Sequence, residues 1–281
     1  MNAVPSNLFD AFTLETTARD SAQFHRDGAL LPPGTRVNIA YLSSETLEQR
    51  LEAVSTLVQQ GLSPFPIISS RRLGSVDVLE RYLSEAIRLA DIRGILLVGG
   101  DPATPQGPFN DSLEVINSGL LQRFKLQSVS IAGYPQGHPK IADEVLWRYL
   151  EQKVRALQDQ GCAVDITTQL TFDAEAVVAW IEQVRRAGIQ APIHIGVPSP
   201  STLPGLLKFA SQCRVGVSMA MIKQYGWKAT SLLSNVGPEA FLAVLQQAVA
   251  QRDLGDVRLH VFPLTGLPTM MHWINGYSDG R

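Results

Sequence analysis

The sequence predicts a (β/α)8 barrel, in which eight parallel strands are each followed by a helix. The main observation is that short apolar runs and amphipathic stretches alternate eight times along the 281 residues. A second observation is that no linker or low-complexity segment divides the chain. We therefore expect a single domain over residues 1–281. A doubly wound open sheet is the alternative, but no G-x-G-x-x-G motif follows the first strand-like run.

The strand-like runs are mostly continuous and apolar or β-branched, rather than strictly alternating. This pattern is typical of parallel strands that are covered on both faces. The eight runs lie at 12–16, 37–42, 65–69, 94–99, 128–133, 164–170, 192–197 and 257–264. A ninth run at 214–218 is too short for a main strand, and we interpret it as an extension near the seventh.

Amphipathic stretches with helix start and stop signals separate these runs. The first, "SETLEQRLEAVSTLVQQG", opens with Ser44 and Glu45 at the expected N-cap and closes on Gly61. Further helices are expected at 75–92, 142–161, 173–188, 200–213 and 237–253.

Composition excludes several classes of partner. The hydrophobic fraction of 45% and charged fraction of 18% are those of a globular protein with a substantial core. A net charge of −2 gives no basic field for nucleic acid or an anionic membrane. Cys162 and Cys213 match no metal or disulfide spacing, so we expect buried thiols and no metal site. The first twenty residues lack a signal peptide, and no apolar run is long enough for a membrane span. We expect a soluble, cytoplasmic protein whose oligomeric state is open, a homo-oligomer included.

Polar side chains gather where the predicted strands end. "LLVGGDPATPQGPF" and "SIAGYPQGHPKI" each leave an apolar run and enter a loop rich in Gly, Pro and polar residues. In a barrel of this type the active site lies at the carboxyl ends of the strands. The side chains predicted there are Glu15, Asp101, Tyr134, His138 and Gln169.

Each of these residues also has a structural explanation. Glu15 fits a solvated loop acid, and Asp101 before Pro102 fits an N-cap or an Asx turn. His138 fits a cap of the helix that follows. Gln169 is harder to explain in this way, because a buried amide needs partners at both of its ends.

Four segments, in order and spacing, resemble methylenetetrahydrofolate reductases. They are "GGDP" (99–102), "AGYPQGHP" (132–139), "ITTQLTFD" (166–173) and "GVPSPSTLPGLLKFA" (196–210). The family typically shows R-G-D, A-Y-P-E-x-H-P, I-T-Q-x-F-F-D and G-I-x-P, on a (β/α)8 barrel. "TLETT" resembles the family's first strand, S-F-E-F-F-P. The resemblance covers nearly the whole chain, and its specific part is 94–210.

The resemblance implies a flavoprotein that interconverts 5,10-methylene- and 5-methyltetrahydrofolate with FAD and NAD(P)H. It implies that Asp101 lies near the flavin N1–C2 edge and the pterin, where a carboxylate shapes the flavin potential. Ala132, Tyr134 and His138 would belong to the cofactor site, with the tyrosine and histidine at the flavin and its ribityl-phosphate arm. Lys153 would meet the FAD phosphates, with a register uncertain by one turn because of an insertion before Gly161.

The same resemblance implies the roles on the folate side. Gln169 would hydrogen-bond the folate or the nicotinamide, which alternate at one flavin face. Glu15 would help protonate N10 of methylenetetrahydrofolate, so that its five-membered ring opens. Tyr225 and Trp227, in a segment that departs from the family pattern, would either stack on the folate or serve as ordinary packing aromatics.

Several departures from the family pattern touch the cofactor site. The family's arginine before G-D is Gly99 here, and a flavin-contacting histidine is Ile67. "AYLSSE" (40–45) replaces T-Y-G-A-G-G after the second strand, and the aromatic run after Glu15 is absent. Arg71 and Arg72 would either replace lost phosphate contacts or lie on a solvated face.

These departures leave alternatives open. The divergence favours a variant that serves one-carbon catabolism over one that supplies methionine synthesis. A flavin-free folate oxidoreductase is one alternative, and a non-redox pterin-binding barrel for methyl transfer or an accessory role is another. A lyase or aldolase lacks support, because no predicted strand ends in the lysine that Schiff-base chemistry needs.

Overall fold

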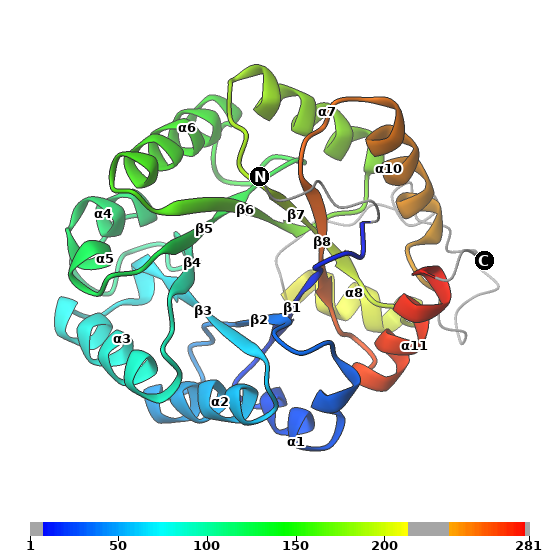
Figure 1. The fold of residues 1–281 in the computed structure, drawn as a ribbon. Helices are drawn as coiled ribbons and strands as arrows, with labels where there is room; N and C mark the ends of the chain where they lie inside the picture. Colours follow the sequence, from blue (N-terminus) through cyan, green and yellow to red (C-terminus); the bar gives the residue numbers. More distant parts are fainter. Residues whose placement is uncertain (1–7, 213–235, 279–281) are drawn as a thin grey trace. The chain divides into compact units, whose positions relative to one another are not determined.

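The computed structural model describes residues 8–212 and 236–278, and its eight strands form a closed barrel in the order β1 to β8 (Figure 1). The recorded pairs of neighbouring strands are parallel. The (β/α)8 fold class is therefore confirmed. The strands are β1 Thr13–Thr16, β2 Arg36–Ile39, β3 Ser63–Ser69, β4 Gly94–Val98, β5 Ser128–Gly133, β6 Ala163–Leu170, β7 Ile193–Pro198 and β8 Val257–Phe262.

Helices follow the strands along the chain. They are α1 Phe24–Asp27, α2 Leu47–Gln59, α3 Val76–Ala90, α4 Ser112–Asn117, α5 Leu120–Arg123, α6 Asp143–Asp159, α7 Ala174–Arg186, α8 Leu203–Gln212, α10 Glu239–Gln251 and α11 Leu267–Ser278. Short 3-10 turns lie at Asp20–Gln23, Gly28–Leu30 and Ser70–Arg72. None of the helices within the described ranges combines the length and apolar character that crossing a membrane requires.

The predicted elements agree with these bounds to within a few residues, with one wrong cap. The N-cap of α2 is Thr46 rather than Ser44 or Glu45, because Thr46 forms a capping box with Gln49. The Thr46 hydroxyl accepts from the Gln49 amide, and the Gln49 side chain accepts from the Thr46 amide. The ninth apolar run, 214–218, lies outside the described residues.

The chain divides into two compact units by its contacts. Unit 1 comprises Met1–Leu14, Gly133–His138 and Thr167–Arg281, and unit 2 comprises Glu15–Ala132 and Pro139–Ile166. The expectation of one domain over residues 1–281 stays a prediction.

In unit 2, α2 and α3 pack side by side against the strands β2 to β4 (Figure 1). The strand pairs are in register through Val37 with Pro64, and through Ile68 with Leu97. Most of these strand residues are buried on both faces of the sheet. This explains why the sequence shows continuous apolar runs here.

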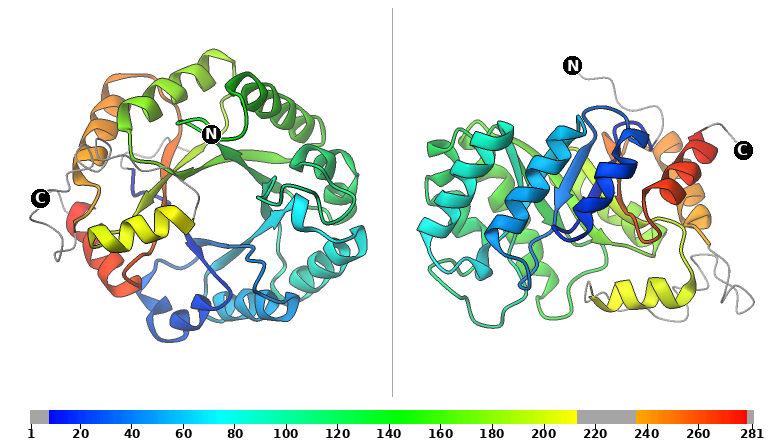
Figure 2. Two further views of the ribbon diagram at one scale, coloured as in Figure 1. Left: turned by 180° about the vertical axis from the view of Figure 1, so that it is seen from behind. Right: turned by 90° about the horizontal axis from the view of Figure 1, so that it is seen from below.

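In unit 1, β7 and β8 pair along their whole length, from Ile193 with Val257 to Pro198 with Phe262. The helices α7 and α10 pack against each other. Figure 2 shows that α8 lies beyond the carboxyl end of β7 rather than alongside the strand. There the Phe209 ring of α8 lies 5.4 Å from the Phe262 ring at the end of β8.

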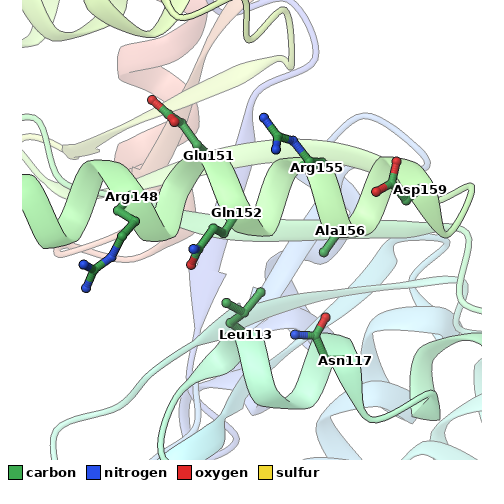
Figure 3. Close-up of a pocket in the computed structure, with 8 residues that line it drawn as sticks. All are labelled: Leu113, Asn117, Arg148, Glu151, Gln152, Arg155, Ala156 and Asp159. Carbon is green, nitrogen blue, oxygen red and sulfur yellow. The ribbon is translucent and has the colours of Figure 1, made fainter.

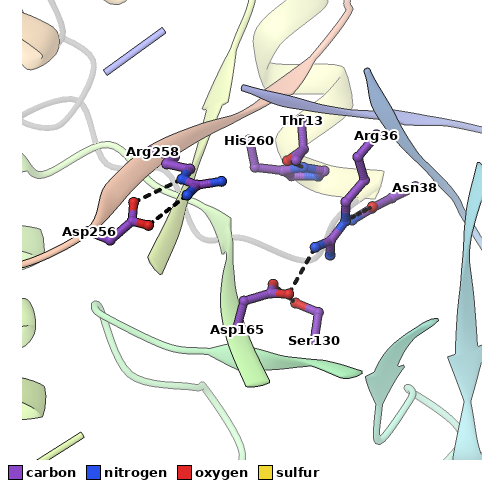
Figure 4. A network of polar contacts seen from close by, with 8 residues as sticks. All are labelled: Thr13, Arg36, Asn38, Ser130, Asp165, Asp256, Arg258 and His260. Carbon is purple, nitrogen blue, oxygen red and sulfur yellow. Dashed lines mark hydrogen bonds and ion pairs between the residues drawn. The ribbon is translucent and has the colours of Figure 1, made fainter. Parts of the chain in front are cut away.

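One buried face in unit 2 is polar, although the interior of such barrels is usually filled by Val, Ile and Leu. The Arg36 guanidinium donates to Asp165 Oδ2 at 2.9 Å and to Asn38 Oδ1 at 3.1 Å (Figure 4). Ser130 donates to Asp165 Oδ1 at 2.5 Å, and Arg36 lies 3.4 Å above the Phe65 ring. The network therefore links β2, β5 and β6 through one ion pair.

Unit 1 also buries polar side chains on its strands. Thr13 Oγ1 lies 2.8 Å from His260 Nδ1, joining β1 to β8, and both residues are buried (Figure 4). Near the start of β8, Arg258 pairs with Asp256 through two hydrogen bonds of 2.8 and 2.6 Å. Hydrogen bonding of this kind is what makes polar groups tolerable in an interior.

Candidate active site at the carboxyl ends of the strands

In unit 1 the loop after β5 is fastened to the end of β6. The backbone N–H of Phe172 donates to Gln136 Oε1 at 3.0 Å. The Gln169 amide donates to the Gly137 carbonyl at 3.4 Å, a long hydrogen bond. The structure therefore brings Tyr134, His138 and Gln169 into one loop cluster, as the sequence predicts for residues at neighbouring strand ends.

The rings of Tyr134 and His138 pack edge to face, with centroids 5.5 Å apart. Burial of the hydroxyl raises the pKa of Tyr134 above its usual range. Its phenol is therefore neutral at physiological pH and can donate a hydrogen bond. Together the two rings offer an aromatic wall with polar edges.

Gly196 of β7 allows an unusually close approach to β6 at the position of Gln169. A Cβ at Gly196 would lie only 2.5 Å from the Gln169 carbonyl oxygen. Two threonines of this region bond to the same glycine: Thr168 Oγ1 accepts from its N–H at 2.8 Å, and Thr171 Oγ1 donates to its C=O at 3.0 Å. Hydrogen bonds on both sides of Gln169 in the sequence thus hold its backbone against β7.

In unit 2, Asp101 follows β4 after two glycines, Gly99 and Gly100. Gly100 has a φ of 91°, and a Cβ there would collide with the Ser69 hydroxyl at the end of β3. The Asp101 carboxylate accepts a hydrogen bond from Arg72 Nη2 at 2.5 Å. The two side chains are largely covered, with exposed fractions of 32% and 17%.

Arg71, the neighbour of Arg72, binds backbone carbonyls. Its guanidinium donates to the carbonyls of Pro102 at 2.8 Å, Ala103 at 2.5 Å and Asn110 at 2.7 Å. The Arg71 N–H also donates to the Gly99 carbonyl at 2.9 Å. Arg71 therefore anchors the loop after β4, which is neither of the two explanations offered for these arginines.

Glu15 and Ala132 lie on their strands as predicted. Glu15 is the third residue of β1 and is partly exposed, while Leu14 and Thr16 are buried. It shares a face of β1 with Thr13, because side chains two apart on a strand point the same way. Ala132 likewise shares the face of β5 that carries Ser130, one pleat nearer the carboxyl end.

Lys153 has neighbours within the protein. It lies in the middle of α6, with its ammonium 5.6 Å from the centre of the Tyr149 ring. Burial lowers the pKa of Lys153, and the nearby charge of Asp111 partly restores it. Asp111 itself caps α4 through the amides of Leu113 and Glu114. These contacts favour a structural role, so the phosphate-binding role stays a prediction.

A groove of about 480 Å³ lies between α4 and α6 in unit 2 (Figure 3). Its charged lining residues are Arg148 and Arg155 together with Glu151 and Asp159. The opposite charges balance, so the groove has no marked preference for an anion or a cation. It lies on the helices, not at the strand ends.

The sequence does not reveal the residues that anchor the loops. Gln136 accepts a hydrogen bond from the Phe172 backbone, and Arg71 donates to three loop carbonyls. Both contacts join residues of different loops, for which no local sequence pattern exists. Tyr225, Trp227 and Cys213 lie outside the described residues. Over 8–212 and 236–278, no three His, Cys, Asp or Glu side chains gather as a metal site would require.

The sequence matches a known protein family over most of its length. The model of the family described as methylenetetrahydrofolate reductase matches residues 26–265. The chain belongs to this family. The four segments that carry the resemblance lie inside the matched range.

Curated members of the methylenetetrahydrofolate reductase family are distant and longer. Methylenetetrahydrofolate reductase 2 of Saccharomyces cerevisiae is 30% identical over 194 residues, which cover 64% of this chain and 31% of that protein. Methylenetetrahydrofolate reductase (NADH) 1 of Arabidopsis thaliana is 29% identical over 150 residues, covering 47% of this chain and 24% of that protein. The matched segments thus span a quarter to a third of these relatives.

Solved structures support the barrel fold at low sequence identity. An uncharacterised protein from Clostridium thermocellum, described as binding two copies of 5-methyl-5,6,7,8-tetrahydrofolic acid, superposes with a TM-score of 0.63. It is 9% identical and covers 95% of this chain and 96% of that one. Dihydropteroate synthase from Thermus thermophilus superposes with a TM-score of 0.51 at 12% identity, covering 98% and 95% of the two chains.

Proposed function

We propose that the protein is an oxidoreductase of folate metabolism that interconverts 5,10-methylene- and 5-methyltetrahydrofolate, with FAD as cofactor and NAD(P)H as hydride donor. The observation that carries the proposal is the family match over residues 26–265, which includes every candidate strand end except that of β1. A fold neighbour described as binding 5-methyltetrahydrofolate supports the same class of ligand.

In this proposal the unit 1 cluster recognises flat heterocycles. The Gln169 amide can donate and accept at once, which suits the amide edges of both a pterin and a nicotinamide. Its backbone is held by the bonds at Gly196, so little ordering is needed when a ligand binds. The neutral Tyr134 phenol and the His138 ring supply a wall beside it.

Glu15 is the proposed general acid. A carboxylic acid within reach of N10 can give it a proton, which weakens the bond between N10 and the methylene carbon and opens the ring. Glu15 is partly exposed on β1, whereas its neighbours on the strand are buried. In the oxidative direction the same carboxylate takes the proton back.

The residues fit FAD at its ring end better than at its phosphate end. In unit 1, Tyr134 and His138 would contact the flavin ring and ribityl arm. In unit 2, Ala132 and Asp101 are the residues proposed to contact the flavin. FAD would supply the means of passing hydride between nicotinamide and folate. Arg71 is committed to loop carbonyls, and Lys153 faces Asp111.

A second candidate function is that of a folate oxidoreductase without flavin, and an apolar position on β3 supports it. Ile67 is buried in an apolar cluster with Ala40, Phe65 and Leu96, so this position offers a flavin no hydrogen bond. Direct hydride transfer from nicotinamide to the folate would then be required.

The first experiment is an absorbance spectrum of the purified protein before and after FAD is added. Flavin bands that are bleached by NADH and restored by methylenetetrahydrofolate support the main proposal. A colourless protein that still turns over supports the flavin-free candidate. If neither folate turnover nor folate binding is measurable, the function proposed here is wrong.

We also propose that the protein works in one-carbon catabolism, oxidising methyltetrahydrofolate. The motivation is the loss of family side chains at Gly99 and Ile67. Initial rates measured with NADH and with NAD+ decide this point. Strong reduction of methylenetetrahydrofolate with negligible oxidation would contradict it.

A further inference from the structure

Arg72 and Asp101 form an ion pair where two strands of unit 2 end. Arg72 closes the 3-10 turn after β3, and Asp101 begins the loop after β4. Their 2.5 Å contact is the single hydrogen bond that Arg72 makes through its side chain among the described residues. An arginine carries five N–H donors, and within the described residues this guanidinium directs its hydrogen bonding to the Asp101 carboxylate.

The backbone beneath the pair is fixed independently of it. Arg71 holds the loop after β4 through three carbonyls, and the Gln106 N–H donates back to the Arg71 carbonyl at 2.8 Å. Ser70 Oγ donates to the Val98 carbonyl at 3.1 Å, which ties the turn to β4. The Arg72–Asp101 contact is therefore not needed to hold the two backbones together.

The pair instead fixes the side chain of Asp101. An aspartate on a loop samples several rotamers, and a strong cationic partner selects among them. With the Arg72 side chain mostly covered, the guanidinium is itself restrained. The carboxylate is held in place with its charge balanced before any ligand arrives.

We propose that Arg72 is a positioning residue that orders the Asp101 carboxylate to receive N–H donors of a folate pterin. A carboxylate accepts hydrogen bonds through two oxygens, which suits the adjacent ring N–H and amino group of a pterin. This inference rests on the function proposed above. It adds that Arg72, which the proposed function leaves without a role, sets the affinity of the site through Asp101.

The test is a double-mutant cycle on binding, without turnover. The variants are Arg72→Gln, Asp101→Asn and the two combined, and the probe is 5-methyltetrahydrofolate titrated by calorimetry. Arg72→Gln should weaken binding roughly three- to tenfold, because the ligand must then order the carboxylate itself. In the Asp101→Asn background the same change should have no further effect.

Two controls separate positioning from a general effect. Arg72→Lys keeps the charge but not the planar fork, and its affinity should lie between those of the wild type and Arg72→Gln. Arg88→Gln removes a partner of Glu85 on the exposed surface of α3, and should leave the affinity unchanged. Thermal unfolding midpoints of all variants should stay close to the wild type, since Arg71 anchors the loop.

The outcomes are distinguishable. If the wild type binds folate and Arg72→Gln binds equally well, the inference is wrong and the proposed function stands. If Arg72→Gln weakens binding as much in the Asp101→Asn background, Arg72 acts on the ligand directly and positioning is refuted. If the wild type binds no folate, the proposed function fails and this inference fails with it.

Discussion

Replacing Gly196 with alanine tests whether the close approach of β6 and β7 positions Gln169. The added Cβ would lie 2.5 Å from the Gln169 carbonyl oxygen and 2.8 Å from the Thr168 carbonyl oxygen, whereas ordinary contacts begin near 3.4 Å. Both neighbours are backbone atoms, so the strands themselves must separate by about 1 Å.

The cost follows from the strain and from the bonds that the movement breaks. Overpacking of a tight interior costs about 1–3 kcal/mol. Separation also stretches the hydrogen bond from the Gly196 N–H to Thr168 and the one from Thr171 to the Gly196 carbonyl, which adds about 1 kcal/mol. We expect Gly196→Ala to lose about 3 kcal/mol of unfolding free energy, and to lower the melting temperature by about 6–10 °C.

The assay is urea unfolding followed by circular dichroism, with hydrogen exchange at the Thr171 amide as a local readout. That amide donates to the Gly196 carbonyl at 3.0 Å, so its exchange should accelerate. Gly276→Ala in α11 is the matched control, because its Cβ meets nothing within 4 Å and alanine favours a helix. A Gly196→Ala variant within 0.5 kcal/mol of the wild type would refute the reasoning.

Three further predictions concern unit 2. Asp165→Asn leaves the Arg36 charge without its ion-pair partner, and should lower the free energy of unfolding in urea by about 3 kcal/mol. Arg36→Gln combined with Asp165→Asn should recover part of that loss. Equal stability of the wild type and both variants would contradict this prediction. Arg71→Gln removes three hydrogen bonds to loop carbonyls, and should accelerate hydrogen exchange of the Gln106 amide by about tenfold or more. An unchanged exchange rate would contradict this prediction. Because burial lowers the pKa of Lys153 in the folded protein, the folded state binds fewer protons there than the unfolded state. The wild type should therefore gain stability relative to Lys153→Met as pH rises toward the unfolded pKa of 10.5, and parallel pH curves would argue against it.

The strands and long helices could be predicted because their signals are local. Continuous apolar runs mark strands covered on both faces, and β5 begins and ends where predicted, at Ser128 and Gly133. The short helices α4 and α5 could not be predicted, because six and four residues are too few for a helical period to show. The helix α11 is a further element that the sequence prediction does not contain.

The sequence singles out candidate residues at the strand ends, but it does not reveal the residues that hold them in place. Asp101 is singled out because it follows a strand-like run, and Gln169 because it lies near the end of one. Their partners Arg72 and Gly196 come from neighbouring strands, and only the pairing of those strands brings them near. Arg36 begins β2, whereas the predicted strand begins at residue 37, because a charged residue gives no apolar signal.

The carbonyl contacts of Arg71 have a consequence for how this loop can change. Every residue has the same backbone carbonyl oxygen, so the hydrogen bonds from Arg71 to Pro102, Ala103 and Asn110 do not depend on the side chains at these positions. Substitutions between these points alter what the loop presents without loosening its attachment. Arg71 therefore makes this segment a natural position for grafting new specificities onto the barrel, provided that the arginine itself is kept.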